Sequence, residues 1–233
     1  MRPDQLCAVY HALLERYGPQ HWWPGETPFE VMVGAVLTQN AAWANVARAI
    51  DRLKAAACLD PRAILDCDPE ELAGLLRPSG YFNVKAARLS ALCAWYLEVG
   101  GMTALAQWPT DRLRHELLRV KGVGPETADD ILLYAFERPV FVIDAYTRRL
   151  FSRLGLIQGQ EDYEVLRRAF EAALGPDVPV YNEYHALIVR HAKEVCRTRP
   201  QCERCPVRGR CRSTTLAVTE TRQSRQRSRA GTS

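Results

Sequence analysis

Residues 117–147, LLRVKGVGPETADDILLYAFERPVFVIDAYT, decide the fold of this chain. The stretch predicts a helix, a Gly-Val-Gly turn, a second helix that begins at Pro125, and a third helix opened by Asp144. Proline is well tolerated at a first helical position, because its missing N–H would have no intrahelical partner there. The segment is therefore a pair of helices joined by a hairpin and followed by a third, capped helix.

The hairpin predicts a phosphate-binding site. Gly122 and Gly124 permit positive φ or close backbone approach on either side of the apolar anchor Val123. Such a turn directs backbone N–H groups outward at a helix N-terminus, and Lys121 adds a positive charge. The hairpin could hold a nucleic-acid backbone without reading its bases. Glycine is also common in ordinary helix–helix turns, so both interpretations stay open at this point.

The second helix leads towards a candidate active-site carboxylate. One face of this helix is predicted to be buried, and carries Ala128, Ile131, Leu132 and Ala135. An apolar run at residues 140–143 then ends at Asp144, which occupies a helix N-cap position. An aspartate there is either a plain cap or a carboxylate available for chemistry, and the two roles are compatible.

Four cysteines near the C-terminus have metal-ligand spacing. Cys196, Cys202, Cys205 and Cys211 form the pattern Cys-x5-Cys-x2-Cys-x5-Cys. We expect no signal peptide at the N-terminus, and no apolar run is long enough to cross a membrane. A cytoplasmic protein with a metal site is therefore expected rather than disulfides. Four thiolates suit either tetrahedral zinc or an iron–sulfur cluster, and spacing alone does not choose. The other cysteines, Cys7, Cys58, Cys67 and Cys93, are predicted to be core side chains.

Positive charge is concentrated at the C-terminal end. The net charge is +4, but residues 197–233 contain ten arginines and two glutamates, whereas the preceding 196 residues carry a net charge of −4. The basic end therefore surrounds the cysteines, where it would attract phosphate. Residues 212–233 are rich in Ser, Thr, Gln and Arg, and we expect a disordered basic tail.

Helical signals dominate the rest of the chain. Pro residues follow Thr27, Asp60 and Asp68, each of which can cap the helix that begins there. No stretch alternates between apolar and polar residues for long enough to predict a sheet, so the predicted class is all-α.

The hairpin, the helix after it and Asp144 resemble the helix-hairpin-helix DNA glycosylases of the endonuclease III superfamily, also called HhH-GPD. The resemblance extends over residues 29–211. It implies two helical domains with a DNA-binding cleft between them: residues 26–139 with the hairpin, and residues 1–25 together with 140–211. It also favours a [4Fe-4S] cluster over zinc on the four cysteines, although the family usually has six residues in the first gap rather than five.

The resemblance assigns DNA contacts to three segments. Gln39 and Asn40, in the sequence Thr-Gln-Asn, match the segment that enters DNA near the flipped nucleotide. Tyr81 lies in a loop that matches the family's intrahelical wedge. The third segment is the hairpin, with Lys121, Gly122 and Gly124. The expected partner is double-stranded DNA with a damaged base, bound by a monomer in the cytoplasm or nucleoid and away from membranes.

Catalysis is expected to depend on Asp144. Breaking an N-glycosidic bond builds positive charge on the deoxyribose, which a carboxylate stabilises while it orients water. Members with lyase activity carry a lysine at the hairpin position that is Glu126 here. A carboxylate cannot form a Schiff base, so we expect a monofunctional glycosylase. Glu126 would then contact the base or water, or simply favour the first turn of its helix.

The substrate prediction depends on aromatic residues. Trp22, Trp23 and Trp43 are predicted to stack on the flipped base, although core packing would also explain them. Aromatic faces favour cations, and alkylated purines such as 3-methyladenine are cationic. The combination is most similar to the 3-methyladenine branch of the superfamily. Three alternatives stay open: a mismatch thymine or uracil glycosylase, an oxidised-pyrimidine glycosylase with lyase activity, and a DNA-binding module without catalysis.

Overall fold

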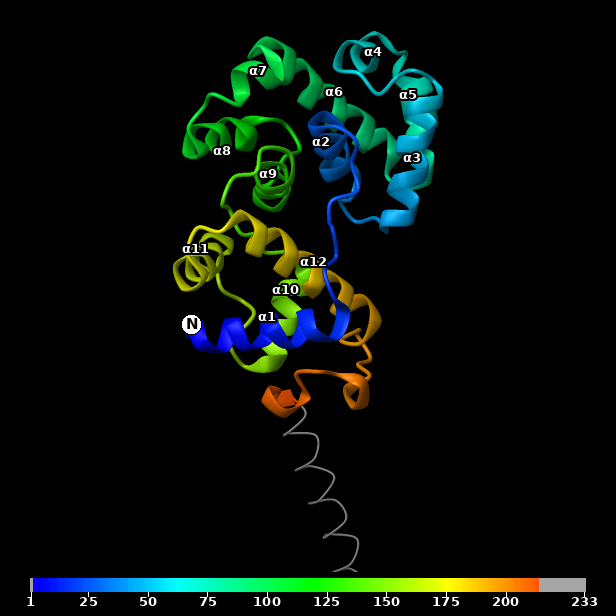
Figure 1. Cartoon of the computed structure of the whole chain (residues 1–233). Helices are drawn as coiled ribbons and strands as arrows, with labels where there is room; N and C mark the ends of the chain where they lie inside the picture. The colour runs from blue at the N-terminus through cyan, green and yellow to red at the C-terminus, as the bar shows by residue number, and fades with distance from the viewer. Residues whose placement is uncertain (1, 214–233) are drawn as a thin grey trace, which may run out of the picture. The chain divides into compact units, whose positions relative to one another are not determined.

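A computed structural model describes residues 2–213 of the chain (Figure 1). Within these residues all regular structure is helical and no strand occurs, which confirms the all-α prediction. The chain divides into two compact units, Trp23–Val142 (unit A) and Met1–Trp22 with Ile143–Ser233 (unit B). The domain boundaries expected from the sequence were residues 26 and 139. Most of the predicted basic tail, residues 214–233, lies outside the described part.

Unit A contains the hairpin. Its helices are α2 (Pro28–Leu37), α3 (Trp43–Ala55), α4 (Pro61–Asp66), α5 (Pro69–Leu76), α6 (Phe82–Glu98), α7 (Gly101–Leu105), α8 (Thr110–Arg119) and α9 (Pro125–Asp130). A 3-10 turn, η1 (Arg77–Ser79), precedes α6, and a π-helical turn, η2 (Ile131–Ala135), continues α9.

Unit B contains Asp144 and the four-cysteine segment. Its helices are α1 (Pro3–Tyr17), α10 (Ala145–Leu154), α11 (Tyr163–Leu174) and α12 (Val178–Glu194). Two 3-10 turns, η3 (Cys202–Arg204) and η4 (Arg208–Arg210), follow in the cysteine segment. The first and last parts of the described chain therefore belong to one unit.

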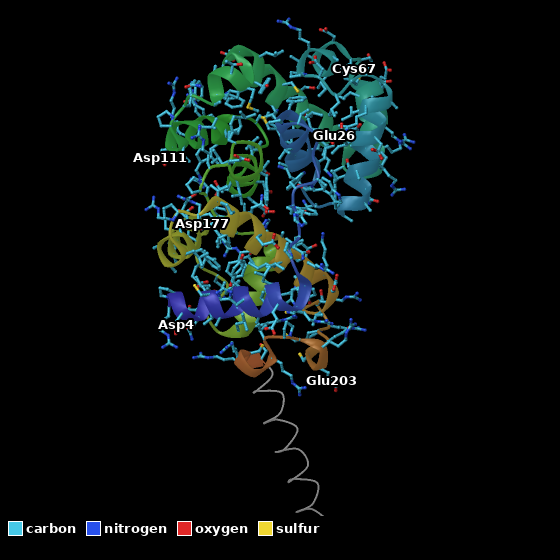
Figure 2. The ribbon with its side chains drawn as sticks, in the orientation of Figure 1. Asp4, Glu26, Cys67, Asp111, Asp177 and Glu203 are labelled. Atoms are coloured by element: carbon cyan, nitrogen blue, oxygen red, sulfur yellow. The ribbon has the colours of Figure 1, made fainter. Side chains whose placement is uncertain are left out.

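Side-chain caps explain where many of the helices begin. The carboxylates of Asp60 and Asp68 each accept two backbone N–H bonds at the starts of α4 and α5. Thr27 accepts from the N–H of Glu30 at the start of α2, and the carboxylate of Glu30 accepts from the N–H of Glu26 rather than from that of Thr27. Asp177, labelled in Figure 2, caps α12. These caps satisfy N–H groups that a helix leaves without an intrahelical partner.

Helix α2 is the centre of unit A. From Glu30 to its end every residue is buried, and its two faces belong to two apolar clusters. One cluster includes Met32 and Val36 together with residues of α8, α9 and η2. The other includes Val33 and Leu37 together with residues of α3, α5 and α6. The central position follows from the almost unbroken apolar sequence of α2, since a helix that is apolar all round must be covered on all sides.

The core of unit B is formed by α1, α10, α11 and α12. Phe151 and Phe170 are fully buried with their rings edge to face at 4.8 Å, and the hydroxyl of Tyr184 donates to the carbonyl of Leu6 at 2.8 Å. Between residues 2 and 213 no helix is both long and apolar enough to cross a membrane.

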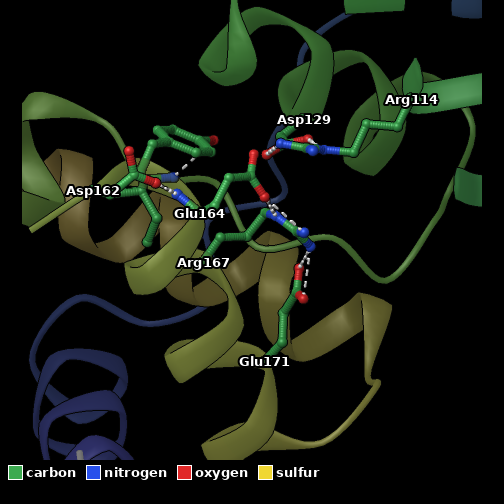
Figure 3. A network of polar contacts seen from close by, with 8 residues as sticks. Arg114, Asp129, Asp162, Glu164, Arg167 and Glu171 are labelled. Carbon is green, nitrogen blue, oxygen red and sulfur yellow. Dashed lines mark hydrogen bonds and ion pairs between the residues drawn. The ribbon is translucent and has the colours of Figure 1, made fainter. Parts of the chain in front are cut away.

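Ion pairs stabilise the individual units. In unit A the guanidinium of Arg114 donates to both carboxylate oxygens of Asp129, at 2.6 and 3.2 Å, and joins α8 to α9 (Figure 3). In unit B Arg167 pairs with Glu164 and Glu171 along α11 (Figure 3). The Arg114–Asp129 pair is bidentate and Asp129 is fully buried, so it fixes the angle at which α9 leaves the hairpin.

Candidate active site and DNA-contact surface

The hairpin between α8 and α9 contains two glycines, and only one of them is required by contacts within the protein. Gly122 has φ +92°, and a Cβ atom there would collide with the aliphatic stem of Arg88. Gly124 has φ −95° in extended backbone, and an added Cβ would meet nothing within 4 Å. Val123 is buried, as predicted. The protein itself therefore requires glycine at 122, whereas at 124 the bare backbone leaves room for an outside partner.

Lys121 and Glu126 lie on either side of this hairpin, and both are exposed. Glu126 is in the first turn of α9, where a carboxylate is favoured by the helix dipole.

Gln39 is bound to the hairpin of its own unit. Its side-chain amide donates to the carbonyl of Gly122 at 3.0 Å and to the hydroxyl of Thr127 at 2.8 Å. Its carbonyl oxygen accepts a hydrogen bond from Arg88. The amide that the sequence assigns to DNA contact thus has three partners within the protein, and it also fixes the position of the loop that follows α2.

Asn40 and Tyr81 are the exposed tips of two neighbouring loops. Both have positive φ, +54° for Asn40 and +46° for Tyr81, a region that L residues seldom occupy. Tyr81 is 72% exposed, the most exposed of the large apolar side chains in the described chain. A large aromatic side chain exposed to solvent on a strained backbone is typical of a residue that contacts a binding partner.

Asp144 in unit B is a buried carboxylate that also caps a helix. One carboxylate oxygen accepts from the N–H of Thr147 at 2.6 Å, which makes Asp144 the N-cap of α10, as predicted. The other oxygen lies 3.6 Å from Nε2 of His185 on α12. Asp144 is only 8% exposed and His185 is 5% exposed. The carboxylate is thus held from two directions.

The surroundings of Asp144 favour its ionised form despite its burial. Burial by itself raises the pKa of this carboxyl, but the nearby ring of His185 and the hydrogen bond from the N–H of Thr147 outweigh it, so its pKa lies below the ordinary 3.8. Lys193 on α12 also interacts electrostatically with Asp144. Burial lowers the pKa of Lys193, and the charge of Asp144 partly restores it. A buried carboxylate that stays charged can stabilise a developing cation.

Trp22 lines a pocket in this same unit. The pocket has a volume of about 290 Å³, and its wall includes Trp22, Lys193 and Arg190. The ammonium group of Lys193 lies 5.7 Å from the ring centre of Tyr146, two residues after Asp144.

Trp23 and Trp43 pack together in unit A. Their rings meet edge to face at 5.2 Å, and the ring of Tyr134 lies 5.1 Å from Trp23. The structure therefore brings two of the three predicted pocket tryptophans into one aromatic cluster, while Trp22 belongs to unit B.

The four cysteines of the C-terminal segment interact with one another. Burial is the main cause that raises the pKa of Cys205 to about 11. A backbone hydrogen bond at Val207 opposes this rise, and the other three thiols add to it. Arg153 donates to the sulfur of Cys196 at 3.3 Å, and the thiol of Cys211 donates to the carbonyl of Arg153 at 3.2 Å. In residues 2–213 no group of three or more His, Cys, Asp or Glu side chains has converged as a metal site. The donor set, four thiols, suits an iron–sulfur cluster or tetrahedral zinc.

Four residues near these sites were not predicted from the sequence: His185 and Lys193 in unit B, and Lys85 and Arg88 on α6. Lys85 on α6 is almost fully buried, which is rare for a lysine without specific partners, but its burial is visible only in the structure. No sequence pattern links His185 to Asp144, since they are brought together only by the packing of α10 against α12.

Comparison with known proteins identifies the family to which this chain belongs. The profile of the HhH-GPD superfamily of base excision DNA repair proteins matches residues 33–176. A protein of Methanocaldococcus jannaschii, provisionally named a DNA repair glycosylase, is 47% identical over 90% of this chain and 97% of its own length. Endonuclease III of Thermotoga maritima is 27% identical over 79% of this chain and 82% of its own length.

Solved structures show the same fold. The Helicobacter pylori 3-methyladenine DNA glycosylase MagIII, bound to 1,N6-ethenoadenine, is 31% identical, with a TM-score of 0.72 over 83% of this chain and 98% of that chain. An endonuclease III–DNA complex has a TM-score of 0.80 over 94% of this chain and 99% of that chain, at 22% identity, and supports the fold alone.

Proposed function

Because the chain belongs to the HhH-GPD superfamily of base excision DNA repair proteins and is a DNA glycosylase, we propose that it is a monofunctional enzyme that hydrolyses the glycosidic bond of alkylated purines. The observation that carries this proposal is the buried carboxylate of Asp144, which accepts from the N–H of Thr147 and lies 3.6 Å from the ring of His185. The ligand and the activity named for the MagIII structure, which is 31% identical, favour 3-methyladenine as the substrate.

Asp144 would act through its charge. As the glycosidic bond lengthens, positive charge develops on the deoxyribose, and a carboxylate held in a site of low water content stabilises it strongly. The same carboxylate can orient the water that attacks C1′. The N–H of Thr147 and the ring of His185 fix the two oxygens, so little reorganisation is needed during the reaction.

The absence of lyase chemistry is proposed from the lysines. Glu126 occupies the hairpin position where a lysine nucleophile is expected in bifunctional members, and a carboxylate cannot form a Schiff base. Of the four lysines in the chain, Lys54 pairs with Glu26, labelled in Figure 2, and with Glu30. Lys85 donates to two buried carbonyls. Lys121 and Lys193 are the residues to test, Lys193 in particular because burial lowers its pKa.

Recognition of the base is proposed to use aromatic faces. Trp22, Trp23 and Trp43 remain the candidates, and an aromatic face attracts a cationic alkylated base more strongly than a neutral one. The glycosidic bond of such a base is already weakened, so a single carboxylate is sufficient for its cleavage.

The cysteine segment is proposed to hold a [4Fe-4S] cluster, with zinc as the alternative. Cys196, Cys202, Cys205 and Cys211 would be the ligands, and the cluster would hold the segment and the arginines around it in one conformation. Hydrogen bonds such as the one from Arg153 to Cys196 would tune such a cluster.

The decisive experiment measures release of free bases from methylated double-stranded DNA. Wild-type protein should release 3-methyladenine and leave an intact strand with an abasic site. Asp144→Asn removes the charge but retains a good helix cap, so it should abolish release while DNA binding persists. Near-native release by the Asn variant would reduce Asp144 to a cap, and excision of thymine from a G·T pair without release of methylated bases would refute the alkylpurine assignment.

The lyase question has its own test. Borohydride should trap no covalent enzyme–DNA adduct, and strand cleavage should require added base or a separate endonuclease. A trapped adduct that disappears in Lys193→Met or in Lys121→Met would contradict the monofunctional assignment and identify the nucleophile.

A further inference from the structure

Two basic side chains of α6 connect three loops of unit A. The loops are residues 38–40 after α2, residues 79–81 before α6, and the hairpin residues 121–124. Each contains at least one residue that the family resemblance assigns to DNA. The side chains are Lys85 and Arg88, which lie one helical turn apart.

Lys85 connects the first two loops through one carbonyl at the start of each loop. It is only 1% exposed, and its ammonium group donates to the carbonyl of Leu37 at 2.8 Å and to the carbonyl of Ser79 at 2.7 Å. Leu37 is the last residue of α2 and Ser79 is the last residue of η1. A buried ammonium is costly unless it is fully hydrogen-bonded. The ammonium supplies a donor to two carbonyls at the ends of α2 and η1, so the lysine also fixes how these two ends lie relative to each other.

The backbone is strained directly beyond each bound carbonyl. Asn40 follows Leu37 by three residues and has φ +54°, and Tyr81 follows Ser79 by two residues and has φ +46°. Such conformations persist only where the surroundings hold them. Two bonds from one buried ammonium supply that restraint on both loops together.

Arg88 connects the first loop to the hairpin. Its guanidinium donates to Gln39, whose amide donates in turn to Gly122 and Thr127. The aliphatic stem of Arg88 lies against Gly122, at the place where a Cβ would have to be. The hairpin position is thereby coupled to the loop that carries Asn40.

We propose that Lys85 and Arg88 are positioning residues that couple the phosphate-binding hairpin to the two loops that probe the interior of the DNA helix. Binding of the hairpin to the backbone then places Asn40 and Tyr81 in a fixed register for a damaged nucleotide. The inference rests on the DNA-contact roles of these loops, but it concerns lesion engagement and not the chemistry of base removal.

The test uses a synthetic duplex with a tetrahydrofuran abasic analogue and 2-aminopurine opposite it. This probe has no damaged base to release, so its result is independent of the substrate and of Asp144. Wild-type full-length protein should bind it more tightly than the undamaged duplex. It should also raise the 2-aminopurine fluorescence, because the loops unstack this base opposite the abasic analogue. Tyr81→Ala should remove the fluorescence rise and define the signal of the wedge.

Lys85→Met should bind undamaged duplex as the wild type does. Its preference for the abasic duplex, measured as the ratio of the two affinities, should fall by about tenfold or more, as expected when a positioned group is displaced. The fluorescence rise should be lost as well. Lys85→Arg should recover part of both. Arg88→Met, which keeps the stem against Gly122, gives an independent test if Lys85→Met does not fold. Arg52→Met, an exposed charge on α3 of the same unit, is the matched control.

Wild-type preference and fluorescence in folded Lys85→Met, or in Arg88→Met, would overturn the coupling. An equal loss of affinity for both duplexes would do so too, because it would show a general electrostatic effect. Absence of base release from methylated DNA in a protein that passes this test would instead refute the proposed substrate.

Discussion

At Asp144 the cost of burying a carboxylate is offset by two groups from different helices. The N–H of Thr147 belongs to α10 and the ring of His185 to α12, and the charged and titratable groups that act on the carboxylate are His185 and Lys193. The arrangement keeps the pKa of Asp144 low. A folded-state pKa below the unfolded value contributes stability that is present above 3.8 and is lost as the pH falls through the folded pKa.

This arrangement predicts the acid limb of the pH–rate profile. If ionised Asp144 is required, single-turnover base release should persist at pH values below the pKa of an ordinary aspartate side chain, 3.8. His185→Leu removes a group that lowers the pKa of Asp144, so the acid limb should move to higher pH while DNA affinity at neutral pH is unchanged. An acid limb at the same pH in the two proteins would show that His185 does not act on the carboxylate.

The two hairpin glycines should respond differently to alanine. Gly122→Ala combines positive φ with a collision against Arg88 and should lower the free energy of unfolding by ~1–3 kcal/mol. Gly124→Ala has normal φ and open space, so stability should be retained while affinity for all duplexes falls, because the methyl group keeps phosphate away from the backbone. Thermal unfolding and fluorescence anisotropy measure the two effects. Unchanged DNA affinity in Gly124→Ala would mean that DNA does not approach there.

The sequence identified some of these residues and missed their partners. Asp144 and Val123 could be predicted because a cap position and an apolar anchor between glycines are local patterns. His185, Lys85 and Arg88 could not, since each acts on a residue far away in the sequence and only packing brings the two together. The same limit applies to Gln39, whose bonds to the hairpin have no local signature.

At the scale of elements, the helix starts were well predicted. Proline after Thr27, Asp60 and Asp68 marks α2, α4 and α5 correctly, because the caps are formed by neighbouring residues. The buried face predicted for the second helix of the hairpin runs from Ala128 to Ala135, as expected for one continuous helix. In the structure α9 ends at Asp130 and continues as the π-helical turn η2, which has no recognised sequence signal.

The four-cysteine segment, residues 196–211, should depend on the proposed cluster for its structure. It contains only short 3-10 turns, so a bound cluster would supply most of its structural restraint. Protein purified without oxygen should be brown and contain iron and sulfide, and Cys202→Ser should lose both and unfold this segment at lower temperature. Cys7 on α1 is exposed, so its predicted place in the core was wrong, and Cys7→Ser serves as the control. Colourless protein with one zinc per chain would contradict the cluster assignment.

At the scale of the whole molecule, charge is distributed unevenly between the segments. The net charge of residues 197–233 is strongly positive, although that of the chain is only +4. Within the described residues, Arg204, Arg208 and Arg210 are exposed beside the cysteines. When such arginines neutralise DNA phosphates, counterions are released. The salt dependence of the affinity then grows with the number of neutralised phosphates and does not depend on the DNA sequence.

The salt dependence of binding should therefore report on this segment. Arg208→Gln should weaken binding to undamaged and damaged duplexes by the same factor and reduce the slope of log Kd against log salt concentration by about 1, as expected for one lost phosphate contact. Arg204→Gln together with Arg208→Gln should reduce it by about 2. Arg168→Gln, an exposed charge on α11 of the same unit, changes the net charge equally and should leave the slope as it is. Equal slopes in the Arg208 and Arg168 variants would mean that only total charge matters, and would place the DNA away from the cysteine segment.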